Sequence, residues 1–81
     1  MTEYVTKQLN IAAFLYASGL QFTDADNLNG EFFFKFTPKE KAEILVNQYF
    51  TGNANVNPRE LFARLKDLKD LVFSQKNSNY G

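Results

Sequence analysis

The sequence contains neither cysteine nor histidine in its 81 residues. Disulfides are therefore excluded, and zinc, iron–sulfur and histidine-ligated haem sites lose their usual ligands. The commonest general base and the thiol nucleophile are missing too, because histidine and cysteine supply them. We therefore expect no cofactor, no metal and no enzymatic activity.

The chain also lacks an excess of charge and a long apolar run. Nine Lys and Arg residues balance nine Asp and Glu residues, so nothing indicates a general polyanion binder. No apolar run approaches the ~20 residues of a transmembrane helix, and the opening Met-Thr-Glu-Tyr is not the charged start of a signal peptide. The sequence predicts a cytoplasmic protein that does not contact a membrane.

Apolar residues, in contrast, are abundant. Hydrophobic residues make up 44% of the chain, and phenylalanine alone contributes nine. A chain of this length has room for one domain with one core. Burying one phenylalanine stabilises a fold by about 1.5–3 kcal/mol, so these rings can form most of a small core.

The apolar pattern predicts a single small α+β domain over residues 1–73, in the order helix, β-hairpin, helix, helix, with residues 74–81 as a frayed tail. We expect helices at 6–18, 38–50 and 58–73, strands at 20–23 and 31–36, and a short N-terminal edge strand at Tyr4 and Val5. Gly19 and Gly52 should end the first two helices, because glycine accepts the left-handed backbone found there.

Three helix starts carry capping signals. Thr37 is expected to cap the second helix, with Glu40 completing a capping box. Asn57 followed by Pro58 repeats this pattern before the last helix. Thr6 is expected to cap the first helix.

The register of the hairpin has two interpretations. Asn29-Gly30 suits a two-residue type I′ turn, which would align Phe22 with Thr37 and place Phe22 on the face opposite to Phe34. The core should contain these rings on one side. We therefore expect a longer loop with an odd number of residues, and Phe22 opposite Phe32 or Phe34.

Six apolar side chains are predicted to be buried together. They come from the first helix, the phenylalanine-rich strand and the inner stripes of the two later helices. They are Phe14, Phe34, Leu45, Tyr49, Leu65 and Leu68.

Several segments taken together resemble a known family. They are Asn10–Leu15, the phenylalanine-rich strand, Tyr49–Gly52 with Val56 following, and Leu65–Lys69. In this combination the chain resembles a family of small bacterial and phage proteins that is catalogued only as a domain of unknown function. The resemblance implies no activity, cofactor or catalytic residue, and is consistent with a small stand-alone accessory protein.

Three carboxylates, Asp24, Asp26 and Glu31, cluster around the expected hairpin loop. They could act as an acid–base pair or begin a calcium-binding loop. The EF-hand pattern fails, however, because Leu28 and Lys35 stand where the fifth and twelfth positions need oxygen ligands. We favour the interpretation that these residues form the turn.

The phenylalanine-rich strand and the helix after it supply candidates for a partner surface. Alternate aromatic residues on a strand can stack nucleic-acid bases, but in so short a chain we expect those at 32, 34 and 36 to face the core. Phe33 then lies on the other face with Lys35 and needs cover. Ile44 points outward from its helix. Phe33, Ile44 and Lys35 are therefore the partner-binding candidates.

The last helix carries the second set of candidates. Basic and aromatic side chains fall within one sector about 80° wide at helical spacing. They are Arg59, Phe62, Lys66, Lys69 and Phe73. Such a stripe can bind phosphate backbones or an acidic partner, or it can be an ordinary solvated flank whose lysine stems cover the rings.

Two functional hypotheses follow. The first is a non-enzymatic interaction module that binds another protein, or a second copy of itself, through the faces of Phe33 and Ile44. The second is a nucleic-acid-binding accessory protein that uses the stripe on the last helix. A small enzyme is disfavoured because acid–base and nucleophilic residues are scarce.

Overall fold

The computed structural model describes the backbone of residues 3–78 and the side chains of residues 3–74. The elements are β1 (Tyr4–Thr6), α1 (Leu9–Ala17), β2 (Gln21–Leu28), β3 (Glu31–Thr37), α2 (Lys39–Thr51) and α3 (Pro58–Ser78). This order confirms the predicted α+β class, the hairpin between helices and the short N-terminal strand.

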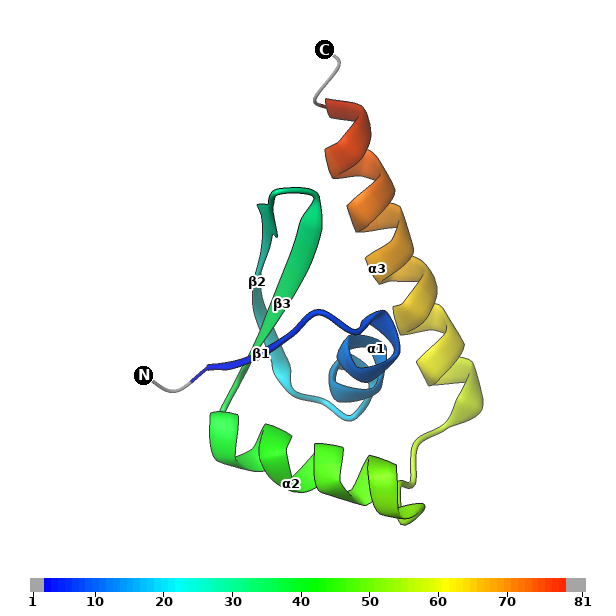
Figure 1. The fold of residues 1–81 in the computed structure, drawn as a ribbon. Helices are drawn as coiled ribbons and strands as arrows, with labels where there is room; N and C mark the ends of the chain where they lie inside the picture. Colours follow the sequence, from blue (N-terminus) through cyan, green and yellow to red (C-terminus); the bar gives the residue numbers. More distant parts are fainter. Residues whose placement is uncertain (1–2, 79–81) are drawn as a thin grey trace.

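The three strands form one antiparallel sheet in the order β1-β3-β2, so β3 is central. Figure 1 shows α1 in the middle of the molecule, with the hairpin on one side and α2 and α3 around the others. The face of β3 that carries Phe32, Phe34 and Phe36 is buried, which confirms that these rings belong to the core.

The core is centred on α1, whose residues Ile11–Leu15 are all buried. This helix is apolar on most sides, and it is surrounded for that reason. Of the six side chains predicted to be buried together, all six meet in one cluster, but only three are fully buried. Phe14, Phe34 and Leu68 are buried, and Leu45, Tyr49 and Leu65 pack half-buried against them. The rings of Phe14 and Tyr49 lie 5.1 Å apart between centroids.

The hairpin turn corrects the prediction. β2 continues to Leu28, and only Asn29 and Gly30 connect it to β3, with φ values of 55° and 86°. These angles suit the two-residue turn that Asn-Gly favours. The expectation of a longer, odd-numbered loop is therefore wrong, and Asp24 and Asp26 lie in a strand rather than in a loop.

A β-bulge at Thr23 explains how the short turn and a one-sided core are both satisfied. The register shifts between the pairs Phe22↔Phe36 and Asp24↔Lys35. The extra residue in β2 reverses its alternation, so Phe22 faces the core after all. Its partner is Phe36, and the expected pairing with Phe32 or Phe34 is wrong.

Two of the three predicted helix caps are wrong. Thr6 belongs to β1, and its Oγ1 accepts a hydrogen bond from the Gln8 N–H at 3.1 Å. Thr37 is the last residue of β3 and pairs with Gln21. Its backbone therefore belongs to the sheet, and it does not cap α2. Asn57 does cap α3, because its Oδ1 accepts the Arg59 N–H at 2.8 Å.

The helix ends follow the glycines. At the end of α1, Gly19 has φ 98°, its N–H donates to Tyr16 O, and the Leu20 N–H donates to Leu15 O, which is a Schellman motif. Gly52 ends α2 with φ 80°. α3 continues past its expected end near Phe73 to Ser78. The residues expected to form a tail are thus helical up to Ser78, and residues 79–81 lie outside the described chain.

Candidate functional site

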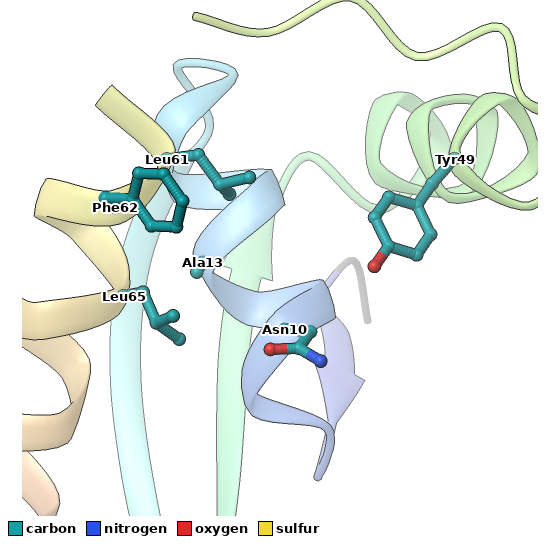
Figure 2. Close-up of a pocket in the computed structure, with 6 residues that line it drawn as sticks. All are labelled: Asn10, Ala13, Tyr49, Leu61, Phe62 and Leu65. Atoms are coloured by element: carbon teal, nitrogen blue, oxygen red, sulfur yellow. The ribbon is translucent and has the colours of Figure 1, made fainter. Parts of the chain in front are cut away.

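An apolar pocket lies where the three helices meet. It has a volume of about 150 Å³ and is lined by Asn10 and Ala13 of α1, Tyr49 of α2, and Leu61, Phe62 and Leu65 of α3. Figure 2 shows Tyr49 projecting from α2 on one side and the three α3 side chains on the other, with α1 between them. A cavity of this volume is large enough for a benzene-sized group.

The positions of the pocket walls are set by residues that lie outside the pocket. The glycine turn that ends α2 and the Asn57 cap that begins α3 set where the two helices stop and start. Tyr49 is held on the α2 side by its contact with Phe14. Leu68, one turn beyond the pocket, is buried and fixes α3 to the core. The pocket walls are therefore anchored to buried core residues.

Exposed aromatic rings extend this apolar surface beyond the pocket. Phe62 lines the pocket and is still 67% exposed. Phe50 is equally exposed, and its ring meets that of Tyr49 edge-on with centroids 5.4 Å apart. Two rings of this size open to water beside an apolar hollow form a surface typical of a binding site.

The stripe predicted on α3 borders this surface, and all five of its members are exposed. They are Arg59, Phe62, Lys66, Lys69 and Phe73. We call Arg59, Lys66 and Lys69 the basic row. Lys66 Nζ lies 3.2 Å from Asp70 Oδ2. In the part of the chain that the structure describes, no ion pair joins Arg59 or Lys69 to a carboxylate.

Arg64 organises the opposite flank of α3 and was not singled out from the sequence. Its guanidinium lies 3.0 Å from Glu60 Oε2 and 3.0 Å from Asp67 Oδ2. It also stacks over the Tyr16 ring at 4.7 Å from the centroid. The spacing of the charges, four residues before and three after, was the signal that could have identified this cluster.

The outer face of the sheet holds two of the predicted partner-binding residues. Phe33 is half-buried opposite Asp26 of β2. Lys35 Nζ lies 2.8 Å from Asp26 Oδ2. The hydrogen bond from Lys35 lowers the pKa of Asp26, and the hydrogen bond to Asp26 raises the pKa of Lys35. Asp26 was expected to form the turn and Lys35 to contact a partner, but the two side chains pair with each other.

The structure does not bring Phe33 and Ile44 together. Phe33 lies in the half of β3 nearer the hairpin turn, whereas α2 crosses the other end of the sheet (Figure 1). Ile44 is 60% exposed on α2. Neither residue lines the pocket.

The described residues lack two further features, a metal-binding cluster and a membrane-spanning helix. Within residues 3–78, no three acidic, histidine or cysteine side chains cluster so as to hold a metal ion. No helix in the same part of the chain combines the length and the apolar character needed to cross a bilayer.

The pocket itself could not be found from the sequence. Its six residues come from three helices, and Asn10 and Ala13 have no feature that distinguishes them from other helical residues. Phe62 was recognised, but as part of the stripe. Tyr49 was recognised as core, which it is in part.

The comparisons with known proteins add one finding. No curated protein matches the chain, and no solved structure matches it. A family model described as Domain of unknown function (DUF5659) matches residues 1–74. The match covers every element up to most of α3 and confirms the resemblance seen in the sequence. The chain therefore belongs to the DUF5659 family.

Proposed function

We propose that this protein is a non-enzymatic accessory module that binds another protein by accepting an apolar side chain into the pocket between α1, α2 and α3. The observation that carries this proposal is Phe62, which lines the pocket and yet remains 67% exposed. A large apolar group at the rim of an apolar hollow gains stability when a partner covers it.

The energetics favour a partner with one anchoring residue. An apolar side chain that enters the pocket contributes about 1.5–3 kcal/mol through its own burial. Covering Phe62 and Phe50 adds a contribution of the same kind. Such central, well-packed aromatic contacts dominate the free energy of most protein interfaces.

The lining of the pocket favours binding over catalysis. Its polar groups are the Asn10 amide and the Tyr49 hydroxyl, and none of its six residues is a carboxylate, a lysine or an arginine. Acid–base and nucleophilic catalysis need a titratable or nucleophilic pair within reach of the substrate. An amide and a phenol in an apolar hollow are better suited to orienting a bound segment.

The proposal is tested by selecting binders from a displayed library of random peptides. Wild-type protein is the target, and the Phe62→Asp variant is used for counter-selection. We expect peptides that bind wild-type protein but lose affinity for Phe62→Asp and for Asn10→Trp. Residue 10 is exposed at the pocket, so a tryptophan there should block the entrance. The matched control is Ile44→Asp, which places the same charge at a comparably exposed apolar site outside the pocket.

The site of binding is then mapped by amide chemical shifts. A selected peptide should perturb Ala13, Tyr49 and Leu65 more than Phe33 or Ile44. Selection that yields no peptide sensitive to Phe62→Asp and Asn10→Trp would contradict the proposal. Perturbation centred on Phe33 or Ile44 would instead move the interaction to the surface first inferred from the sequence.

A second candidate function is single-stranded nucleic-acid binding. It is favoured by the basic and aromatic stripe on α3, all five members of which are exposed, since such stripes stack bases and contact phosphates. It requires affinity for oligothymidylate that falls steeply with salt and is lost in the Lys66→Gln/Lys69→Gln double variant. The zero net charge of the chain weighs against it.

A further inference from the structure

The charges of α3 are segregated around the helix. On one flank, Arg64 pairs directly with both Glu60 and Asp67, and the three groups together keep a negative charge. The other flank carries the basic row, and among the described side chains only Asp70 pairs with it, through Lys66. The helix thus presents a locally positive flank although the chain as a whole has no net charge.

This positive flank lies next to the pocket. At 100° per residue, Lys69 lies about 20° from Phe62 around the helix axis, and Leu65 lies about 40° beyond Lys69 on the inner side. Phe62 and Leu65 both line the pocket. A segment seated in the pocket and passing over Phe62 must therefore run alongside the basic row.

A second copy of this chain does not suit the flank. In an antiparallel pairing of two α3 helices that matches Phe62 with the partner copy's Phe73, the register places Lys66 against the partner copy's Lys69, because both pairs have the same midpoint in the sequence. Like charges placed directly against each other are repulsive. This pairing is therefore disfavoured, whereas an acidic occupant would meet opposite charge along the same flank.

We infer that the occupant of the pocket is an acidic amphipathic segment of another protein, with an apolar anchor in the pocket and carboxylates against Arg59, Lys66 and Lys69. This inference rests on the proposed function. The anchor provides the buried contact, whereas the carboxylates select the partner and speed its association through opposite charge. The Lys66–Asp70 pair is exposed to solvent, so a partner carboxylate can compete for Lys66.

The apolar pocket favours an acidic peptide over a nucleic acid. A polynucleotide would use the basic row for its phosphates and Phe62 and Phe73 for stacking, but a base inserted beside Ala13, Leu61 and Leu65 would bury its polar edge in an apolar hollow. A peptide uses both features at once. Binding of a nucleic acid is accordingly one of the outcomes of the test.

The test begins with the tightest peptide whose binding depends on Phe62 and Asn10. Two versions are synthesised that share its apolar residues and carry either glutamate or lysine at the flanking positions. Fluorescence anisotropy is measured with wild-type protein and with the Lys66→Glu/Lys69→Glu variant. Both substituted lysines are exposed, and the urea midpoint of the variant checks that it remains folded.

We expect wild-type protein to bind the glutamate version at least about tenfold more tightly than the lysine version, a difference of 1.4 kcal/mol. The preference should invert in the double variant and weaken with added salt. Equal affinities for the two versions, or an order that does not invert, would overturn the inference and leave the proposed function standing. Absence of any pocket-dependent peptide would remove the proposed function and the inference with it.

Oligothymidylate serves as the nucleic-acid probe in the same assay. We expect it not to compete with the glutamate peptide at physiological salt. Competition that disappears in Lys66→Gln/Lys69→Gln, together with peptides that do not discriminate by charge, would assign the basic row to nucleic acid and overturn the inference.

Discussion

Phe22 lies directly opposite Phe36, with ring centroids 5.3 Å apart, although the turn at Asn29-Gly30 alone would align Phe22 with Thr37. The bulge at Thr23 makes this contact possible. At the bulge, the Thr23 hydroxyl lies 2.8 Å from Glu3 Oε2 and 3.2 Å from the Lys35 carbonyl oxygen, and it donates to these acceptors. One extra residue thus reconciles a tight turn with a core face that holds Phe22 together with Phe32, Phe34 and Phe36.

Deletion of Thr23 is expected to preserve this register. Phe22 and Asp24 already pair with Phe36 and Lys35, so removing the residue between them leaves a regular ladder. The cost should be limited to the lost hydrogen bond, about 0.5–1.5 kcal/mol. Urea denaturation of the deletion variant measures it.

Deletion of Ala25 is the matched control. The ladder can absorb this deletion only by removing the bulge, which brings Asp24 opposite Phe34 on the core face. Burial of a carboxylate without a partner should make this variant at least about 2 kcal/mol less stable than the Thr23 deletion. Equal losses for the two deletions would contradict the position of the bulge at Thr23.

The pocket leads to a prediction about two leucines one turn apart. Leu68 is 1% exposed, whereas Leu65 is half-buried in the pocket wall. Leu68→Ala should cost about 2–5 kcal/mol because it leaves a closed cavity. Leu65→Ala should cost clearly less, because it enlarges a hollow that already opens to water. Chemical denaturation of both variants decides, and a larger loss for Leu65→Ala would contradict the assigned pocket.

Sequence signals identified the elements wherever one residue determines a local backbone conformation. Gly19 and Gly52 end their helices, and Asn57 caps α3, as predicted. Thr37 carries an equally good capping signal but lies in β3. Its pairing with Gln21 is a tertiary contact. A local sequence signal cannot show whether such a residue will belong to the strand before it or to the helix after it.

The candidate site was only partly predictable for the same reason. The stripe on α3 follows from helical spacing alone, and its exposure agrees with the prediction. The pocket depends on the angle at which α1, α2 and α3 meet, and that angle is set by packing around Phe14 and Leu68. The strand partner of Phe22 depends on one β-bulge, and the residue type at position 23 does not predict a bulge there.

The pair of Asp26 and Lys35 predicts how stability depends on pH. The pKa of Asp26 is lowered by the hydrogen bond from Lys35, so its stabilisation is present above the ordinary carboxyl pKa and is lost as the pH falls through the folded value. The pKa of Lys35 is raised by the hydrogen bond to Asp26, so that contribution is present below the ordinary lysine pKa and is lost as the pH rises through the folded value.

Asp26→Asn should therefore destabilise the protein most between about pH 5 and pH 9. The difference from wild type should shrink in stronger acid and in stronger base. Urea midpoints measured within this range and well beyond it, in stronger acid and in stronger base, provide the test. Glu43→Gln, at an exposed position on α2, is the control and should show no such window. A difference for Asp26→Asn that persists unchanged in strong acid would contradict the role given to the ion pair.

The basic row also predicts a change of oligomeric state from one substitution. In the antiparallel pairing of two α3 helices that brings Phe62 against Phe73, Lys66 meets Lys69 twice, once on each side of the dyad. Lys69→Glu converts both repulsive contacts into ion pairs, each of which is worth about 0.2–1 kcal/mol at an exposed position. Self-association should then occur at a protein concentration about tenfold lower than for wild type.

Light scattering over a concentration series measures this self-association. Lys69→Gln is the control, because it removes the repulsion without adding an attraction, and its self-association should fall between those of wild type and Lys69→Glu. Wild-type protein that already forms a dimer through α3 at low salt, or a Lys69→Glu variant no more associated than wild type, would show that the basic row does not govern what α3 accepts.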